Sequence, residues 1–237
     1  MARTDEAVIL AGGFGTRLQS VVSDVPKPLA PIQGKPFLAF LLERLAVQGF
    51  RRVVLATGYM GDKVRQAMGD HWHGMSLIYS QEQQPLGTGG AIAQAFPQIQ
   101  GDALFVLNGD TYLELDYGAF DEQADTSGAK LGMALAQVPD VARYGAVQVQ
   151  GHRVIGFSEK GLRGPGYINA GVYRLARKVA GAFPALASFS FENAVLVPAV
   201  QDGQVQAFTQ TAAFIDIGVP EDYSRAQLEL GGSESGA

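Results

Sequence analysis

The sequence of 237 residues contains no cysteine, one tryptophan and only three histidines. The absence of cysteine excludes disulfide bonds, thiolate metal sites and a cysteine nucleophile. No apolar run is long enough to span a bilayer, and the apolar run behind the polar first residues is too short for the core of a signal peptide. We therefore expect a soluble cytoplasmic protein that does not act at a membrane.

Charge is also sparse, at 17% of the residues, and the formal net charge is -5. An acidic chain without a basic patch has no electrostatic footprint for nucleic acid, so we expect no nucleic-acid partner. A phosphate-bearing ligand must instead be held by a local cluster of donors and cations. Apolar residues make up 47% of the chain, which is ample for the packed core of one α/β domain.

A glycine-rich segment follows the first strongly apolar stretch. Residues 8–11 are apolar and of strand length, and residues 12–15 then include three glycines. Backbone N–H groups in such a turn can approach an anion without a Cβ in the way. Arg17, together with Lys27 between two prolines, adds positive charge suited to phosphate oxygens. The pattern matches neither the P-loop nor the dinucleotide fingerprint, whose sixth position is Leu18 here, and it predicts a polyphosphate site.

Helix and strand patterns alternate along the first half of the chain. Apolar residues recur at helical spacing over Phe37–Val47, and Arg52–Thr57 has the composition of a buried strand. A helix over residues 60–68 and a strand over residues 77–80 follow. This alternation is typical of βαβ units, and it predicts an α/β fold with a Rossmann-like, doubly wound, mostly parallel mixed sheet.

The pattern changes after residue 128, where strands follow one another through tight connections. Residues 130–137, residues 145–150 and Arg153–Phe157 have strand patterns, with a hairpin closed at Gly151. We expect a small antiparallel extension of the sheet here, on which an acceptor-sugar pocket could be built. A helix over residues 191–200, a strand at Val205–Phe208 and a last helix over residues 220–230 complete the chain.

A second glycine cluster, residues 87–90, precedes a helix expected over residues 91–96. Its amides could contact the edge of a nucleobase, with Gln83 or Gln84 as a polar reader. The alternative is an ordinary loop in which Thr88 caps the helix.

Two aspartates lie at the end of, or within, apolar strand patterns. Asp110 comes directly after a strand at residues 103–107, where it could hold Mg²⁺ against phosphates or merely cap a turn. Asp216 lies within an apolar run and needs a compensating partner if it is buried.

Several separated motifs together resemble the sugar-1-phosphate nucleotidyltransferases. They are Gly-Gly-x-Gly-Thr-Arg-Leu with Pro-Lys-Pro, Asn-Gly-Asp, and Asp-x-Gly-x-Pro-Glu-Asp-Tyr, and they occur in the order found in that family. The resemblance implies the GT-A-like fold of the nucleotide-diphospho-sugar transferases. It also implies one domain over residues 1–230, with a nucleotide-binding half at about 1–127 and a sugar-binding half at about 128–230. Residues 231–237 are expected to be a disordered tail.

The resemblance also implies the site residues. Arg17 and Lys27 are catalytic, and Asp110 and Asp216 bind Mg²⁺. The residues implied to bind the nucleotide are Leu10, Ala11, Gly12, Gly13, Gly15, Thr16, Gln83, Gly87, Thr88 and Asp110. The residues implied to bind the sugar phosphate are Gly109, Tyr144, Gly145, Glu159, Lys160, Asn169 and Gly171.

The activity implied is nucleotidyl transfer from a nucleoside triphosphate to a sugar 1-phosphate. Within the family the chain most resembles the D-glycero-D-manno-heptose 1-phosphate guanylyltransferases, which make GDP-heptose for bacterial surface polysaccharides. The short N-acetylmuramate 1-phosphate uridylyltransferases are an alternative of similar size. A non-catalytic nucleotide-sugar sensor is a further alternative, which the presence of all four charged site residues disfavours. The resemblance leaves the oligomeric state open, a homodimer included.

Overall fold

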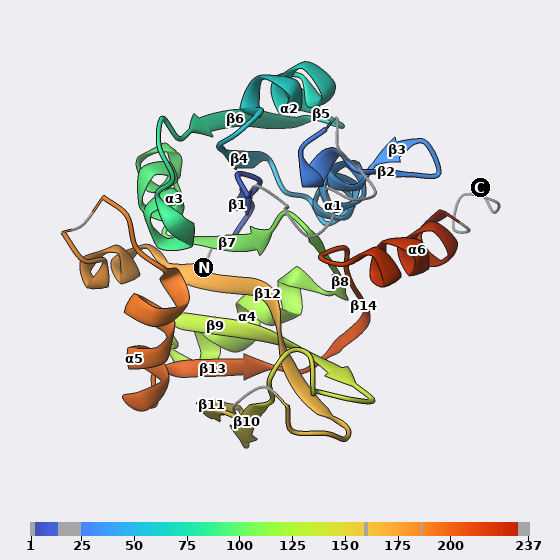
Figure 1. Ribbon diagram of the computed structural model, residues 1–237. Helices are drawn as coiled ribbons and strands as arrows, with labels where there is room; N and C mark the ends of the chain where they lie inside the picture. The colour runs from blue at the N-terminus through green and yellow to red at the C-terminus, as the bar shows by residue number, and fades with distance from the viewer. Residues whose placement is uncertain (1–2, 14–24, 159–160, 186, 232–237) are drawn as a thin grey trace.

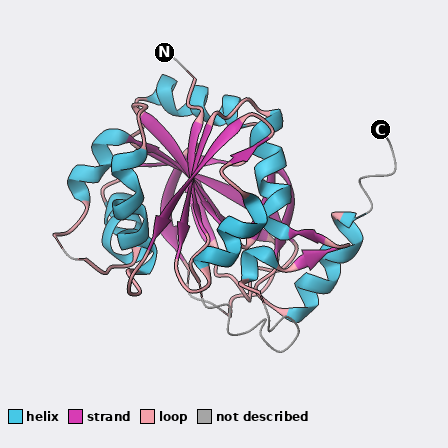
Figure 2. Cartoon of the chain, turned by 90° about the horizontal axis from the view of Figure 1, so that it is seen from above, coloured by secondary structure: helices cyan, strands magenta, loops and turns pink. Residues whose placement is uncertain are grey.

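The computed structural model describes residues 3–13, 25–158, 161–185 and 187–231. Within these ranges one sheet of ten strands runs through the molecule, and helices cover both of its faces (Figures 1 and 2). In spatial order the strands are β10 Val147–Gln150, β11 Arg153–Phe157, β13 Val205–Phe208, β9 Leu131–Val138, β12 Gly166–Ala176, β7 Ala103–Asn108, β1 Glu6–Leu10, β4 Arg52–Thr57, β6 Met75–Gln81 and β5 His71–Trp72.

The centre of the sheet is parallel, with β1 paired to β7 on one side and to β4 on the other, and with β4 paired to β6. Both faces of these strands are buried, which is why they are apolar without a break. In β1, Ala7 and Ile9 join one core cluster, whereas Val8 joins the cluster on the opposite face. The predicted doubly wound arrangement is therefore confirmed.

The second half of the chain adds antiparallel strands. The long strand β12 runs antiparallel to both β7 and β9, and β10 and β11 form a hairpin near the far edge of the sheet. The predicted antiparallel extension is confirmed, but it joins the parallel part through β12 without interruption. The division of the domain near residue 127 stays a prediction, since the halves share one sheet.

The helices lie on both faces of the sheet. Side chains of α1, α2, α4 and α6 join one core cluster, and those of α3 and α5 join the other. The helices are α1 Phe37–Val47, α2 Gly61–Met68, α3 Gly87–Ala95, α4 Tyr117–Ser127, α5 Val197–Gln201 and α6 Pro220–Glu229. Short helical turns lie at Lys27–Leu29, Phe96–Gln98 and Arg177–Ala182, and a wider π-helical turn lies at Glu192–Leu196. None of these helices is long and apolar enough to cross a membrane.

Two small antiparallel pairs lie outside the main sheet. Strands β2 Pro31–Ile32 and β3 Lys35–Pro36 form a hairpin, and β8 Thr111–Leu115 pairs with β14 Thr211–Asp216. The second pair joins segments about a hundred residues apart, and its residues were not expected to pair from the sequence.

Element boundaries agree closely with the sequence pattern except at α3 and before α5. The helix α3 begins at Gly87, four residues earlier than the pattern predicts, so the prediction that the glycines precede it is wrong. Glycine is required there by packing, since a Cβ on Gly89 would lie 2.2 Å from the ring of Phe189. The helix expected over residues 191–200 contains the π-helical turn directly before Pro198, whose missing N–H cannot continue the regular pattern.

Candidate active site

A pocket of about 570 Å³ opens where β1, β4 and β7 end, beside the start of α3. The carboxyl ends of parallel strands are where open α/β sheets bind ligands. The pocket contains nine of the residues predicted for nucleotide binding, sugar phosphate binding or catalysis: Leu10, Gly12, Gly13, Lys27, Gln83, Gly87, Thr88, Gly109 and Asp110. Ala11 is buried beside them and donates its backbone N–H to the carbonyl oxygen of Ala56 at 2.8 Å.

Glycines let three backbone segments meet at the floor of the pocket. The N–H of Gly109 donates to the carbonyl oxygen of Leu10 at 2.9 Å, and a Cβ on Gly109 would lie 2.5 Å from that oxygen. A Cβ on Gly58 would likewise lie 2.9 Å from the carbonyl oxygen of Gly12. Any larger residue at either position would force the strand ends apart, so these glycines shape the pocket through close backbone approach.

Lys27 and Asp110 form an ion pair in the lining of the pocket. The Nζ of Lys27 lies 2.5 Å from Oδ2 of Asp110, and only 12% of the lysine side chain is exposed. Lys27 begins a short helical turn whose first residues are fixed by the flanking prolines, and Asp110 follows β7 after Gly109. The ammonium group is thereby held at a defined place with limited access to water.

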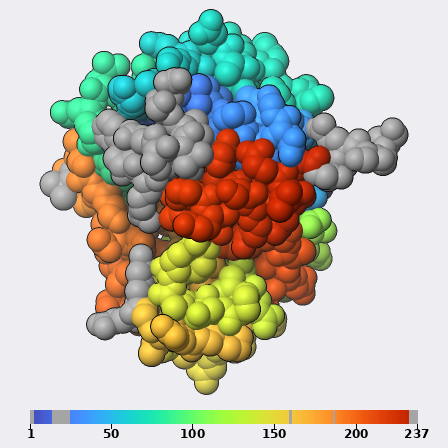
Figure 3. All heavy atoms as spheres, turned by 45° about the vertical axis from the view of Figure 1, so that its right-hand side comes forward, coloured from blue at the N-terminus to red at the C-terminus, as the bar shows by residue number. Residues whose placement is uncertain are grey.

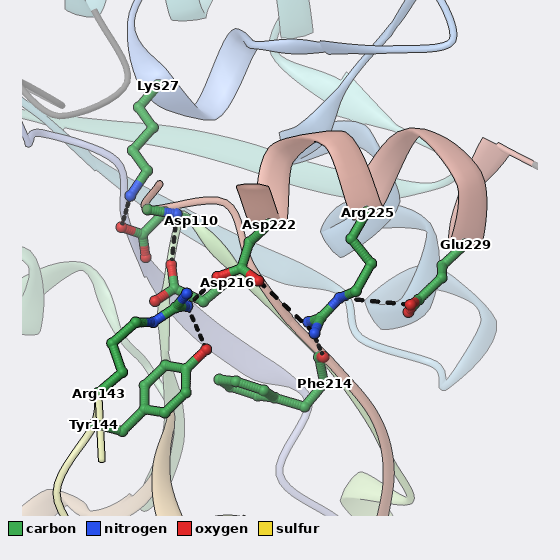
Figure 4. Close-up of polar contacts among 10 residues, drawn as sticks. Lys27, Asp110, Arg143, Tyr144, Phe214, Asp216, Asp222, Arg225 and Glu229 are labelled. Atoms are coloured by element: carbon green, nitrogen blue, oxygen red, sulfur yellow. Dashed lines mark hydrogen bonds and ion pairs between the residues drawn. The ribbon is translucent and has the colours of Figure 1, made fainter. Parts of the chain in front are cut away.

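Asp216 reaches the same place through the pairing of β14 with β8. Asp216 is opposite Thr111, and the N–H of Ile217 donates to the backbone oxygen of Asp110 at 3.0 Å. Burial, and after it the neighbouring charge of Asp110, raises the pKa of Asp216, while Lys27 lowers it. Figure 4 shows Lys27, Asp110 and Asp216 gathered together. The backbone N–H of Gly218 donates to Oδ1 of Asp216 at 2.7 Å.

This pair of carboxylates is suited to a divalent cation. Two buried or partly buried carboxylates whose charges repel each other are stabilised by a metal between them. The described residues include no group of three or more histidine, cysteine, aspartate or glutamate side chains that could complete a metal cage. Mg²⁺ is commonly held by one or two carboxylates plus substrate phosphates, so Asp110 and Asp216 fit that ion.

The second glycine cluster packs against the segment before α5, and its amides are not all available to a ligand. The N–H groups of Gly89 and Gly90 both point to the carbonyl oxygen of Phe189, at 2.9 and 3.4 Å. The hydroxyl of Thr88 accepts the N–H of Phe191 at 3.0 Å instead of capping the helix. Gly87 and Thr88 still line the pocket, so their assignment as base contacts stays a prediction.

Glu82 lines the same pocket and was missed from the sequence. Its Oε2 accepts the N–H of Leu86 at 2.9 Å, which holds the carboxylate within its own loop. A Cβ on Gly12 would lie 3.0 Å from its Oε1, so the carboxylate reaches the first glycine loop. The resemblance to the family's base-recognition loop implied Gln83 instead, whereas the carboxylate of Glu82 is the group that a hydrogen bond within the loop holds in place.

Four of the residues predicted to bind the sugar phosphate belong to β12 and to the loop before β10: Tyr144, Gly145, Asn169 and Gly171. The backbone of β12 bulges between Asn169 and Tyr173, and Gly171 there has a φ of +69°. The side chain of Asn169 accepts the N–H of Gly171 at 3.0 Å and donates to the hydroxyl of Tyr173 at 2.7 Å. Its amide thus shapes the bulge, and its predicted contact with sugar hydroxyls remains untested.

Tyr144 is positioned by contacts within that second half. Its ring packs edge-on against Phe214, with centroids 5.7 Å apart, and burial raises the pKa of its hydroxyl. Gly145 follows with a φ of +85° and closes a turn by donating its N–H to the backbone oxygen of Val141. Five predicted site residues, Gly15, Thr16, Arg17, Glu159 and Lys160, lie outside the described residues, and their roles stay predictions.

Comparison with known proteins identifies the family. A model of the family described as nucleotidyl transferase matches residues 6–232. The D-glycero-alpha-D-manno-heptose 1-phosphate guanylyltransferase of Aneurinibacillus thermoaerophilus is 42% identical, over 95% of this chain and 98% of its own length. The enzyme of that name from Campylobacter jejuni is 41% identical, over 92% and 96% of the two chains.

Solved structures agree with the sequence relatives. The crystal structure of HddC from Yersinia pseudotuberculosis is 41% identical and has a TM-score of 0.85, covering 96% of this chain and all of that one. A second structure of that protein is complexed with GMP-PN. The pocket at the strand ends, the paired carboxylates and these matches lead to one conclusion: the chain belongs to the nucleotidyl transferase family.

Proposed function

We propose that the protein is a guanylyltransferase that transfers the guanylyl group of GTP to D-glycero-α-D-manno-heptose 1-phosphate, releasing pyrophosphate and forming GDP-heptose. The two curated relatives above carry this activity in their names and match the chain over nearly its whole length. The observation in the structure that favours guanine is the carboxylate of Glu82 in the nucleotide pocket.

Glu82 complements guanine better than it complements the other bases. The Watson–Crick edge of guanine presents two neighbouring donors, N1–H and the exocyclic N2–H, and an ionised carboxylate only accepts. Uracil and thymine present one donor between two carbonyl acceptors, and a carboxylate would face those acceptors unfavourably. A charge-assisted pair of this kind is stronger than a neutral one and is well suited to base selection.

The reaction requires alignment and charge neutralisation more than proton transfer. An oxygen of the sugar 1-phosphate attacks the α-phosphorus of GTP, the bond from that phosphorus to the bridging oxygen breaks, and pyrophosphate leaves with the electron pair. The attacking group is already an anion, so no general base is needed. Lys27, fixed beside Asp110, would stabilise charge on the transferring phosphoryl group, and Arg17 would do so on the leaving pyrophosphate.

Asp110 and Asp216 would hold Mg²⁺, which supplies a Lewis acid that draws charge from the phosphate oxygens. Holding the ion also relieves the repulsion between the two carboxylates. The glycines that line the pocket, Gly12, Gly13 and Gly109, would let the backbone approach the phosphates and ribose closely. Glu159 and Lys160 are proposed to contact the sugar and its phosphate.

The direct test is pyrophosphate release by the purified protein with Mg²⁺. Each of GTP, UTP, ATP, CTP and dTTP is paired with the heptose 1-phosphate, mannose 1-phosphate and N-acetylmuramate 1-phosphate. Release mainly with GTP and the heptose phosphate supports the proposal. A preference for UTP and N-acetylmuramate 1-phosphate would replace both substrates while leaving the reaction class in place. GTP binding without release from any pair would favour a nucleotide sensor.

Base selection is tested by replacing the carboxylate of Glu82 with an amide. Glu82→Gln keeps the shape of the side chain but presents one donor to the guanine edge, so we expect kcat/KM for GTP to fall roughly 10- to 100-fold. The kcat/KM for UTP relative to that for GTP should rise, because an amide complements uracil. Gln83→Ala serves as the comparison variant, because Gln83 is the neighbouring residue that the sequence predicted to contact the base. An unchanged ratio of GTP to UTP in Glu82→Gln would show that base selection lies elsewhere.

A further inference from the structure

Arg143 is held in a fixed position by two side chains in the loop between β9 and β10 and in α6. Its Nη2 donates to a carboxylate oxygen of Asp222 and to the hydroxyl of Tyr144, and the guanidinium lies 4.6 Å from the centre of the Tyr144 ring. Asp222 is buried, with 9% of its side chain exposed, whereas 44% of the Arg143 side chain is exposed. A buried carboxylate thus anchors a cation whose other side faces solvent.

The anchored guanidinium lies next to Asp216. In Figure 4 the carboxylate of Asp216 is flanked by Lys27 and Asp110 on one side and by Arg143 on the other. Arg143 therefore continues the row of charged groups beyond the metal-binding pair, on the side away from the nucleotide pocket.

Asp216 and the helix α6 that follows it belong to a well-anchored part of the fold. Asp216 leads directly into α6, and α6 is tied to the β2–β3 hairpin by the hydroxyl of Tyr223, which donates to the backbone oxygen of Pro31. Figure 3 shows the red C-terminal segment lying between blue N-terminal residues and a yellow-green segment. The ion pair of Arg143 with Asp222 connects the loop between β9 and β10 to α6, so it fixes this loop relative to the metal site.

We propose that Arg143 binds the phosphate of the acceptor sugar 1-phosphate and that Asp222 is the positioning residue that orients it. The inference rests on the proposed nucleotidyl transfer. In-line attack requires the acceptor phosphate to lie beside the α-phosphate, opposite the leaving pyrophosphate. With the nucleotide in its pocket and the α-phosphate at Asp110 and Lys27, that place is next to Asp216, where Arg143 lies.

The chemistry of Arg143 suits this role. Within the described residues both of its hydrogen bonds use Nη2, which leaves the N–H groups of Nε and Nη1 for a ligand. A guanidinium remains charged at every relevant pH and donates several hydrogen bonds to phosphate oxygens. A cation here also offsets the repulsion that two phosphates and two carboxylates would otherwise experience.

The test compares kinetics of the full-length variants Arg143→Met and Asp222→Asn with the wild type. For Arg143→Met we expect the KM for the sugar 1-phosphate to rise roughly 10- to 100-fold, with the KM for GTP within about threefold. Asp222→Asn keeps its shape but loses the anchoring charge, so a smaller rise in the same KM is expected. Arg143→Lys should show a smaller rise in this KM than Arg143→Met, because lysine restores the positive charge but not the paired N–H donors of a guanidinium.

Arg225→Met is the matched control. Arg225 also lies near Asp222, at 3.7 Å, but it interacts with Glu229 and with the backbone oxygen of Phe214, away from Asp216. This variant should leave the KM values of both substrates unchanged. Equal increases of the two KM values in Arg143→Met, or no change in either, would overturn the assignment and leave Arg143 a structural link to α6.

Calorimetric titration with the heptose 1-phosphate and with mannose 1-phosphate separates this inference from the proposed function. If the wild type turns over a different sugar 1-phosphate, the proposed sugar is wrong and Arg143 is tested with the sugar that reacts. If the wild type turns over no pair, the proposed function fails. In that case weaker sugar-phosphate binding by Arg143→Met still supports a phosphate-binding arginine, and equal or absent binding in both proteins overturns it.

Discussion

Replacing Gly171 with alanine should destabilise the protein through two separable effects. Gly171 has a φ of +69°, and a Cβ there would lie 2.5 Å from Nδ2 and 2.9 Å from Cγ of Asn108. The left-handed conformation costs an alanine about 1–2 kcal/mol, and forcing an extra methyl group into a packed site costs about 1–3 kcal/mol. Rotation of the Asn108 amide relieves only part of the overlap, because its Cβ is 3.1 Å away. We expect a total loss of about 2–5 kcal/mol.

Two further glycines provide matched controls. Gly128 has nearly the same φ, +66°, but open space around the position of a Cβ, and Gly181 has open space without the unusual φ. Gly128→Ala should therefore lose only about 1–2 kcal/mol, and Gly181→Ala close to nothing. The difference between Gly171→Ala and Gly128→Ala isolates the contact with Asn108.

Urea denaturation at equilibrium measures these differences, and melting temperatures should follow at about 2–4 °C per kcal/mol for a chain of this size. The double variant Asn108→Ala/Gly171→Ala should lose at least about 1 kcal/mol less than the sum of the single variants, because the closest atoms are gone. Equal stability of Gly171→Ala and Gly128→Ala, with additive behaviour of the double variant, would refute the reasoning.

Three further perturbations follow from the charged groups. Arg174→Met removes the ion-pair partner of the buried carboxylate of Asp121, at 3.0 Å, and leaves it only the hydrogen bonds from Thr4, so urea denaturation should show a loss of about 3–5 kcal/mol; a loss below 1 kcal/mol would contradict this. In metal-free protein the raised pKa of Asp216 makes folding more favourable as pH falls from neutrality through its titration range. In Asp216→Asn the free energy of unfolding should therefore depend less on pH over this range, and the variant should be inactive. A pH dependence of unfolding equal to that of the wild type would contradict the raised pKa of Asp216. Lys27→Met should lower kcat roughly 10²- to 10³-fold while remaining folded by circular dichroism, and a loss under tenfold would exclude a catalytic role.

The pattern of apolar residues determined the secondary structure to a large extent. The bounds predicted at Phe37–Val47, Arg52–Thr57 and Arg153–Phe157 are those observed. The helix has apolar residues at helical spacing and the strand at Arg52–Thr57 is a short apolar run, and a turn residue follows soon after each. The first glycine cluster and Asp110 were also assigned correctly to the ends of central strands, since residues that directly follow a buried strand must reach that edge of the sheet. The local sequence pattern is therefore sufficient to predict the bounds of these elements and the residues at the ends of the central strands.

Packing decided the conformation of the second glycine cluster and which side chain of the neighbouring pair Glu82 and Gln83 approaches Gly12. Four glycine-rich positions predict a loop, yet they form the first turn of α3 because the ring and backbone of Phe189 fill the space beside them. The choice between Glu82 and Gln83 depends on which side chain the loop turns toward Gly12, and neighbouring residues of similar polarity carry no local signal about that direction.

The sequence by itself determined the class of the site: a glycine turn, a lysine between prolines, an aspartate directly after a strand and a second aspartate in a strand-like run, each placed by local chemistry. Only the tertiary structure decided how these groups meet. The pairing of β14 with β8 brings Asp216 to Asp110, and the contact of Arg143 with Asp222 spans 79 residues. Such long-range contacts depend on the loop-closure entropy and packing of the whole sheet, which no local pattern encodes.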